Sequence, residues 1–591
     1  MLNYYRITQR PVQEEIYDYF DMLGMMQQCD LPLFGFLRRN QFCEAVKQAA
    51  DMEHLIRSHV SSVMVTFINE PMCIRKTEDP GDKFSKRYEV KGHRHLLRDE
   101  LEAFFIAARK AIYVENPDRM IKNVEGDYDS PTAEGLPDFH CYTMWYSNHG
   151  EPIGRLIKGY LPPVKSGWMI GCGEYGAEGL DNINIIKERY PKQWLTTNPD
   201  GSWYPDKIIR AQTHSVQGDW YQEQNVMEDW VLESQKHQAN ATKLMTDAFR
   251  RRADVINHTA IHLLIDAWPS GWMKTLVGCD RQPKQAYFSY MDSLEPLRVN
   301  LYSDRHYVYG KETVNVEAWL LNDLSEAKNI SILATIKMVG SVVSEYKMDA
   351  VVDAATSICA GLIPMEIPNV EKETLLYLDA CIIDEDGHVM NGERLEFYVY
   401  PSLDTVVLES KISVIGDAAK EYAKIYGYQT SEDLNSTKVA FVSDLSQESM
   451  KELGAYLNKG NKAVLLLPDQ GILEIKIGET RISTKSSSEV FFAASKPELQ
   501  KYHFNMLYNH NQDYIDFIGN RSILCSKEGE NLVYSYAKSG FDGSTGAKAE
   551  LPFVKKVVIG SGTLIIVSLL LDGRVKYNPN MDAFLMNCLK E

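Results

Sequence analysis

In the first half of the chain, segments with a helical spacing of apolar residues alternate with short apolar runs. Residues 12–23 carry apolar side chains at positions 12, 16, 19, 20 and 23, which mark one face of a helix, and Gly24 follows as a C-cap. Strands that alternate with helices predict a parallel sheet. Helices are predicted for residues 12–23, 41–60, 97–112 and 228–252, and strands for residues 25–29, 63–67, 120–124, 139–143, 168–172 and 261–266.

The period of the pattern changes twice further along the chain. From about Leu297 apolar and polar residues alternate, as in 314–320 and 395–400, which predicts an antiparallel β-sandwich. After Pro401 apolar runs again flank a helical segment, which predicts a flavodoxin-like α/β domain. Its predicted strands are 439–442, 463–467 and 563–571, and its predicted helix is 446–458. We therefore expect three domains, with the boundaries 1–296, 297–402 and 403–591.

The composition is that of a folded, acidic protein. The chain has 591 residues, of which 44% are hydrophobic, and its 63 basic and 81 acidic residues give a net charge of −18. This charge argues against a nucleic-acid partner, which needs clustered Lys and Arg, and it suits neutral or cationic small substrates. The ten cysteines show no paired spacing, so we expect no zinc site, no redox pair and no cofactor.

No targeting or membrane segment is predicted. Residues 1–6 lack a charged region followed by an apolar one, and the longest apolar run, 563–571, is too short to cross a bilayer. We expect a soluble protein with no membrane partner, and a homo-oligomer is an open alternative. The compartment is also open: cytoplasmic for the chain as it begins, periplasmic or secreted if the natural N-terminus lies upstream.

Two glutamates stand out because each follows an apolar, strand-like run. Glu70 comes after residues 63–67, and Glu174 comes after residues 168–170. The C-terminal end of a buried parallel strand is where a (β/α)8 barrel holds its catalytic groups, and a gap of 174 − 70 = 104 residues corresponds to about three βα units. Two carboxylates that face each other across a barrel mouth suit glycoside hydrolysis. Taken alone, Glu70 is equally well explained as an acid at a helix N-terminus.

Six segments resemble glycoside hydrolase family 2, which includes β-galactosidases, β-glucuronidases and β-mannosidases. Residues 67–71 (FINEP) and 173–176 (GEYG) resemble the acid/base and nucleophile segments of that family. The other four resemble its second barrel strand, the following helix, the sixth strand and the loop after the eighth strand. They are residues 3–6, 17–24, 138–142 and 266–272.

The resemblance implies a role for five residues. Glu70 would be the general acid/base and Glu174 the nucleophile of a retaining glycosidase. Asn69 would bind the sugar 2-hydroxyl, where a hydrogen bond strengthens as the oxocarbenium-like transition state forms. Tyr142 would hold the nucleophile by its hydroxyl, and Arg6 would support the same carboxylate electrostatically.

Three further residues keep two interpretations each. His140 either binds sugar and orients Glu70 or is a hydrogen-bonded core histidine. Trp268 either stacks on the face of the sugar or packs, whereas Trp272 is better explained by packing. Asp30 either binds a hydroxyl or caps a loop.

The chain departs from the family at its N-terminal end. It begins at the segment that resembles strand two, so we expect a partial TIM (β/α)8 barrel that lacks about its first strand. We expect no counterpart in this sequence of the jelly-roll and immunoglobulin-like domains that precede the barrel in the family. The sandwich after the barrel is expected to be immunoglobulin-like.

The last domain resembles the class I glutamine amidotransferase-like fold. The turn that carries the nucleophilic cysteine in that fold reads 467–471 (LPDQG), without a cysteine, so we expect this domain to be non-catalytic.

The function predicted from the sequence is hydrolysis of β-linked sugars by double displacement, exo-acting and galactosidase- or mannosidase-like, on a carbohydrate substrate. The alternatives are an endo-acting retaining hydrolase and a non-catalytic remnant that binds carbohydrate or serves as a scaffold. The chain lacks the Asn-x-Lys clamp expected of a glucuronidase, which is a mild argument against glucuronides.

Overall fold

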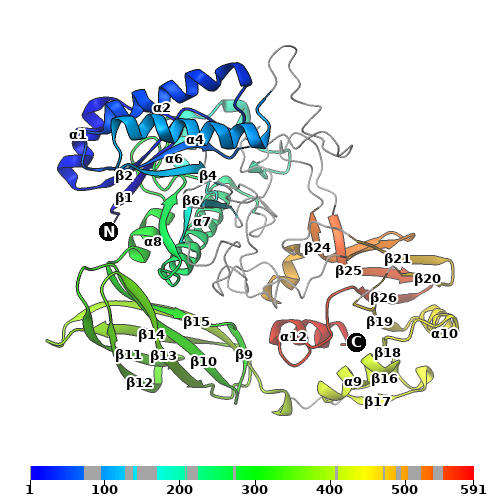
Figure 1. The fold of residues 1–591 in the computed structure, drawn as a ribbon. Helices are drawn as coiled ribbons and strands as arrows, with labels where there is room; N and C mark the ends of the chain where they lie inside the picture. The colour runs from blue at the N-terminus through cyan, green and yellow to red at the C-terminus, as the bar shows by residue number, and fades with distance from the viewer. Residues whose placement is uncertain are drawn as a thin grey trace.

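The computed structural model describes most of the chain, and all structural statements below concern these residues. The described residues are 2–71, 95–126, 138–142, 169–205, 208, 224–269, 274–405, 410–469, 471, 473–486, 494–502, 521–536 and 550–590. They form a multidomain protein in which parallel α/β, antiparallel β and mixed α/β regions follow one another along the chain (Figure 1). No described helix is long and apolar enough to cross a membrane.

The N-terminal region contains two parallel sheets whose edges meet. The first has the order β1-β2-β3-β4 and the second the order β5-β6-β7. Strand β4 lies beside β5, and β1 lies beside β7. The carboxyl ends of both sheets therefore face a common space. The strands are β1 (Tyr4–Ile7), β2 (Met26–Asp30), β3 (Ser62–Asn69), β4 (Met120–Glu125), β5 (Asp138–Cys141), β6 (Ile170–Tyr175) and β7 (Ile256–Ile261).

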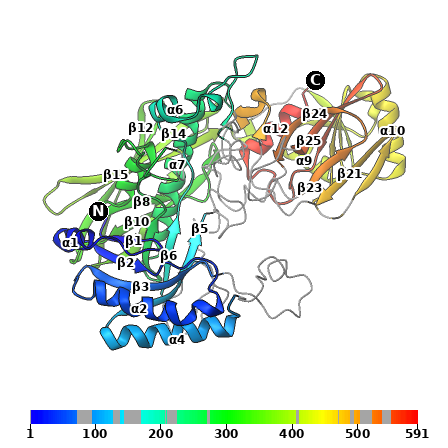
Figure 2. The same ribbon diagram turned by 90° about the horizontal axis from the view of Figure 1, so that it is seen from above.

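Helices cover the outside of these sheets. α2 and α4 lie on the outer side of β3 (Figure 2). Phe67 on β3 contacts Phe104 and Phe105 on α4, and all three rings are buried. α1 ends as predicted at Gly24, which adopts a left-handed φ of 64° that glycine tolerates without strain. The helices are α1 (Glu14–Leu23), α2 (Phe42–Ile56), α4 (Arg98–Glu115), α6 (Ile183–Arg189), α7 (Met227–Arg250) and α8 (Gln285–Ser293).

The strand predicted for residues 261–266 is wrong. The strand in this region, β7, ends at Ile261, and the apolar residues that follow lie in a loop whose carbonyls at Leu263 and Leu264 accept backbone N–H groups from 276 and 277. The apolar residues 263–265 of this run are half-buried or exposed, whereas β7 itself includes polar residues such as His258. The strand predicted for 563–571 also ends early, because β26 spans Gly562–Val567.

The middle region is a sandwich of two sheets. The orders are β13-β10-β8 and β12-β11-β14-β15-β9, and all neighbours are antiparallel except β9 and β15. The inward-facing positions of both sheets form one apolar core, as the two-residue period predicts. The strands are β8 (Leu297–Tyr302), β9 (Tyr307–Tyr309), β10 (Thr313–Asn322), β11 (Lys328–Met338), β12 (Ser341–Val352), β13 (Thr356–Glu366), β14 (Thr374–Ile383) and β15 (Val389–Tyr400).

The C-terminal region is built on an eight-stranded mixed sheet. Its order is β17-β16-β18-β19-β26-β25-β24-β22, parallel from β17 to β26 and antiparallel beyond, and a small antiparallel sheet β20-β21-β23 adjoins it. The elements are β16 (Lys411–Ile415), α9 (Asp417–Ile425), β17 (Gln429–Ser431), β18 (Val439–Val442), α10 (Gln447–Asn458), β19 (Lys462–Leu466), β20 (Glu474–Ile477), β21 (Thr480–Ser486), β22 (Ala494–Ser495), β23 (Arg521–Cys525), β24 (Gly529–Tyr536), β25 (Glu550–Ile559) and α12 (Pro579–Cys588).

Buried polar contacts join the C-terminal region to the sandwich. Helix α12 lies between the two in Figure 1, and its Asp582 accepts hydrogen bonds from Tyr309 Oη at 2.5 Å and from Tyr426 Oη at 2.7 Å. Tyr400 on β15 donates to Asn580 of the same helix at 2.7 Å. A carboxylate that accepts hydroxyl groups from both regions holds them in a defined orientation.

Candidate active site

The structure brings Glu70 and Glu174 together at the carboxyl ends of β3 and β6. Glu174 lies within β6, and Glu70 directly follows Asn69, the last residue of β3. One oxygen of each glutamate and one ring nitrogen of His140 all lie within 4.8 Å of one another. The side chain of Glu174 is 7% exposed, whereas that of Glu70 is 28% exposed. The site is thus a buried carboxylate facing a second one that is open to solvent.

Glu174 is surrounded by hydrogen-bond donors and positive charge. Arg6 Nη1 lies 2.6 Å from its Oε1, and the hydroxyl of Tyr142 donates to its Oε2. Burial on its own raises the pKa of Glu174, but the positive charges of His140 and Arg6 and the hydrogen bond from Tyr142 hold that pKa well below its ordinary value. Glu174 is therefore ionised at neutral pH.

Arg6 connects the nucleophile candidate to two other predicted residues. Its guanidinium donates to Asp30 Oδ2 at 2.6 and 2.9 Å and to Asn69 Oδ1 at 2.7 Å. Asp30 is 2% exposed, and its other oxygen accepts Gln28 Nε2 at 2.9 Å. Both oxygens of Asp30 are thus engaged by protein groups, and its Oδ2 also accepts the backbone N–H of Gln9 at 3.3 Å. Asp30 therefore orients Arg6 and caps the loop after β1, and binding of a sugar hydroxyl stays a prediction.

His140 lies between the two glutamates. Its Nδ1 is 2.7 Å from Glu70 Oε1 and 3.6 Å from Glu174 Oε2. Burial lowers the pKa of His140, but the charge of Glu174, the hydrogen bond with Glu70 and the charge of Asp138 outweigh burial and raise it to about 9. His140 is therefore a buried, protonated donor to Glu70, and its contact with a sugar stays a prediction.

Four charged or titratable residues that the sequence did not single out form a layer beneath the glutamates. Lys122 Nζ, which is fully buried, lies 2.5 Å from Glu125 Oε2, 3.0 Å from Asp138 Oδ2 and 3.0 Å from His258 Nε2. Glu125 Oε1 is 3.2 Å from Arg6 Nε. The signal available in the sequence was a lysine and a glutamate in or next to the run 120–124, which is otherwise a buried strand.

Two more residues near Glu174 come from the loop region after β7. His262 Nε2 lies 3.7 Å from Glu174 Oε2, and burial lowers the pKa of His262 to about 3. Lys274 Nζ lies 4.2 Å from the centre of the Tyr142 ring, and burial holds the pKa of Lys274 well below its ordinary value. His262 is therefore neutral at pH 7.

The tryptophans predicted for the rim are not part of this cluster. Trp268 is 61% exposed, and no contact among the described residues joins it to either glutamate. Trp272 lies outside the described residues. An exposed indole in the loop after β7 leaves both interpretations of Trp268, stacking and packing, as predictions.

Two sets of donors in the cluster have the spacing of cation ligands. They are Glu70, His140 and Glu174, and Glu125, Asp138 and His140. The carboxylates of these sets already face Arg6, Lys122 or protonated His140, whose charges compensate theirs. The donors therefore suit an ion-pair network better than a metal, which needs deprotonated ligands.

Comparisons with known proteins find likeness at the level of structure. No protein-family model and no curated protein matches the chain. A β-D-mannosidase from Dictyoglomus thermophilum is similar over 68% of this chain and 46% of its own, with 17% identity and a TM-score of 0.49. The exo-chitosanase CsxA from Amycolatopsis orientalis is similar over 93% of this chain and 60% of its own, with 12% identity and a TM-score of 0.47.

A β-glucuronidase from Bacteroides uniformis is similar over 71% of this chain and 43% of its own, with 14% identity and a TM-score of 0.34. The names of all three proteins are those of glycosidases. The chain spans between 43% and 60% of the length of these three structures. Because the TM-scores are below 0.5, the functional argument rests on the geometry of the site.

Proposed function

We propose that the protein is a retaining β-glycosidase with Glu174 as nucleophile and Glu70 as general acid/base. The observation that carries this proposal is the approach of their carboxylate oxygens to within 4.8 Å. Retaining glycosidases hold the two carboxyl groups about 5–5.5 Å apart, whereas inverting ones hold them about 6.5–9.5 Å apart to admit a water molecule. The spacing therefore supports direct attack by a carboxylate.

In the first half of the reaction Glu174 attacks the anomeric carbon while Glu70 protonates the departing oxygen. Glu174 is suited to attack because its pKa is held low by neighbouring positive groups. Arg6 and Tyr142 each hold one of its two oxygens, so the carboxylate has a fixed orientation. The product of this step is a glycosyl ester on Glu174 and a free alcohol.

Asn69 is oriented to bind the sugar. Arg6 has only donors, so the atom of Asn69 that it contacts at 2.7 Å is the amide oxygen. The amide NH2 of Asn69 is then turned to the other side, where it donates to the sugar 2-hydroxyl. This bond strengthens as the ring gains oxocarbenium character.

In the second half of the reaction water cleaves the ester. Glu70 removes a proton from the water, which attacks the anomeric carbon, and Glu174 leaves as a carboxylate. The greater exposure of Glu70 fits this role, because the alcohol must leave and the water must enter on its side. His140 orients Glu70 in both steps through the 2.7 Å hydrogen bond.

The fold proposed for this function is an incomplete (β/α)8 barrel followed by two accessory domains. β1–β7 supply seven successive strands, and the meeting of β1 with β7 supports a ring. The boundaries proposed are 1–296 for the barrel, 297–402 for an immunoglobulin-like sandwich and 403–591 for a flavodoxin-like domain. The last is proposed to be non-catalytic, because the turn 467–471 has no cysteine and because burial raises the pKa of Cys588 to about 12 and keeps it a thiol.

The substrates proposed are neutral β-linked glycosides, cleaved from the chain end as by galactosidases or mannosidases. The test is hydrolysis of aryl β-galactoside, β-mannoside, β-glucoside and β-glucuronide by the full chain, with product stereochemistry followed by proton NMR. We expect the β-anomer to form first from at least one substrate, and Glu174→Ala to abolish turnover. Glu53→Gln is the matched control, because Glu53 is also a buried carboxylate but pairs with Arg119 away from the site.

The outcomes separate the alternatives. Initial formation of the α-anomer would overturn the retaining mechanism. Failure to turn over any substrate, in a chain that has the secondary structure described here by circular dichroism, would overturn the proposed activity. Binding of a sugar without turnover would then favour the non-catalytic carbohydrate-binding alternative.

A further inference from the structure

A buried aspartate that has no part in the proposed chemistry lies behind the two glutamates. Asp138 opens β5, and its side chain is fully buried. Its Oδ1 accepts the backbone N–H of Gly126 at 2.9 Å and that of Gly173 at 3.2 Å. Its Oδ2 accepts Lys122 Nζ at 3.0 Å. One carboxylate thus holds the backbone at the ends of β4 and β6 together.

The first of these contacts reaches Glu70 through one peptide unit. The N–H of Gly126 belongs to the same planar unit as the C=O of Glu125, and that C=O accepts the N–H of Glu70 at 2.7 Å. Glu70 has a φ of 44°, a region that is strained for a residue other than glycine and is kept only where neighbours hold it. Asp138 therefore helps to fix the backbone from which Glu70 projects.

The second contact reaches Glu174 through Gly173. Asp138 accepts the N–H of Gly173, and the C=O of Gly173 accepts Arg6 Nη1 at 3.3 Å, so the peptide units on both sides of this glycine are held. A Cβ at position 173 would lie 2.9 Å from Asp138 Oδ1 and would overlap the carboxylate of Glu125. Only glycine allows these carboxylates to approach the strand this closely.

We propose that Asp138 is a positioning residue that sets the separation and the orientation of Glu70 and Glu174 through these two backbone amides. The inference rests on the proposed glycosidase function and adds to it the device that maintains the spacing on which retention depends. A carboxylate is required because the two amides and Lys122 are all donors, and His258 Nε2 lies a further 3.5 Å from Oδ2. An asparagine offers one oxygen and one NH2, so its NH2 would face either the two amides or the ammonium of Lys122.

The test is the kinetics of Asp138→Asn on the best aryl glycoside of the panel. We expect kcat to fall about 100-fold, the loss associated with a displacement of about 1 Å of catalytic groups, while KM changes little. Because both glutamates are displaced, the loss is expected with good and with poor leaving groups. A defect confined to Glu70 would instead be largest with poor leaving groups, which need the acid most.

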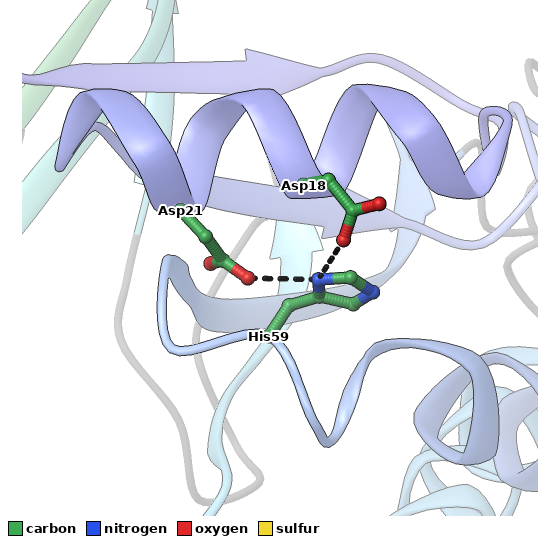
Figure 3. A group of neighbouring side chains, drawn as sticks. All are labelled: Asp18, Asp21 and His59. Carbon is green, nitrogen blue, oxygen red and sulfur yellow. Dashed lines mark hydrogen bonds and ion pairs between the residues drawn. The ribbon is translucent and has the colours of Figure 1, made fainter.

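Asp21→Asn is the matched control for a purely structural effect. Asp21 on α1 also accepts a backbone N–H, from Ser61 at 2.8 Å, and also contacts a histidine, with His59 Nδ1 at 2.9 Å from its Oδ2 (Figure 3). Asp18 Oδ1 lies 3.8 Å from the same Nδ1 of His59 (Figure 3). We expect Asp21→Asn to lower the melting temperature and to leave kcat unchanged.

A second variant keeps the test decisive if Asp138→Asn does not fold. Lys122→Met/Asp138→Ala removes one buried positive and one buried negative charge together, which avoids leaving a single uncompensated ion, and it leaves no acceptor for the two amides. It is expected to fold and to show the same loss of kcat. Wild-type kcat in either folded variant would overturn the role of Asp138, whereas an inactive wild type would overturn the proposed function itself.

Discussion

The charge assigned to His140 can be measured through the pH dependence of stability. Burial lowers the pKa of this histidine, but Glu174, Glu70 and Asp138 raise it to about 9, against a value of 6.5 for an ordinary histidine. The difference is 9 − 6.5 = 2.5, and at 1.36 kcal/mol for each pKa unit the protonated ring contributes about 3 kcal/mol. Replacement of His140 by glutamine removes this contribution.

The direction of the effect follows from proton linkage. Because the folded-state pKa of His140 is raised, its contribution is complete below pH 6.5 and is lost as the pH rises through 9. The advantage of the wild type over His140→Gln should therefore shrink by about 1.4 kcal/mol per pH unit between these limits. His258 and His262 do not interfere, because burial lowers their pKa values to about 4 and about 3, below this window.

Hydrogen exchange of the amides in β5 and β6, followed by mass spectrometry, measures this difference where it arises. Wild type and variant are compared at the same pH, so the intrinsic exchange rates cancel. Glu70→Gln provides a second check, because loss of this carboxylate lowers the pKa of His140. The change in stability between pH 6.5 and 9 should therefore be smaller in this variant. If the stability difference between the wild type and His140→Gln stays constant or grows between pH 6.5 and 9, His140 is not protonated as assigned.

Three further changes test other parts of the structure. Arg6→Met should lower the free energy of unfolding in urea by about 3–5 kcal/mol and abolish turnover, because it leaves buried carboxylates without their positive partner. Unchanged activity would contradict the role of Arg6. Gly173→Ala should be inactive, because the added methyl group overlaps Glu125, and a crystal structure with both residues in place would contradict this. Burial raises the pKa of Asp582 to about 6, so its protonation should stabilise the docked α12 by up to about 3 kcal/mol as the pH falls from 6 to 4. Asp582→Asn should lack this gain when thermal unfolding is compared with the wild type at each pH, and an equal gain in the variant would argue against it.

Periodicity predicted the elements whose buried face is apolar. α1 has one apolar face and a glycine at its C-cap, so both its existence and its end followed from local rules. α10 begins as predicted at Ser446, whose hydroxyl accepts the N–H of Ser449. The sandwich strands also agree with their two-residue period, because one face of each sheet is buried in a common core.

Periodicity predicted strand β4 but not the burial of the charged residues within it. Lys122 and Glu125 on β4 are fully buried, although charged residues within a strand pattern are normally assigned to the solvent face. Their burial depends on partners such as Asp138 and Arg6 from other strands, which no local pattern contains. The prediction placed a strand at 261–266 instead of β7, because β7 is polar and the loop that follows it is apolar.

The charges inside the ring of strands explain why a site of this kind suits a developing cation. Glu70, as the proposed general acid, is protonated when the first half of the reaction begins and is not counted. The positive groups then number three and the carboxylates four, so the sum is 3 − 4 = −1 with Glu125 ionised, and zero where the raised pKa of buried Glu125 leaves it protonated. The positive groups are Arg6, Lys122 and His140, and the carboxylates are Asp30, Glu125, Asp138 and Glu174.

A residual negative charge in a buried site stabilises an oxocarbenium-like transition state more than a neutral ground state, because the interaction grows as charge develops on the sugar. It would also oppose an anionic sugar, for which no uncompensated positive partner exists among these groups. The interior network thus has two functions that a purely apolar core cannot supply. It holds Glu174 ionised, and with Glu125 ionised it leaves a net negative charge that suits the proposed reaction.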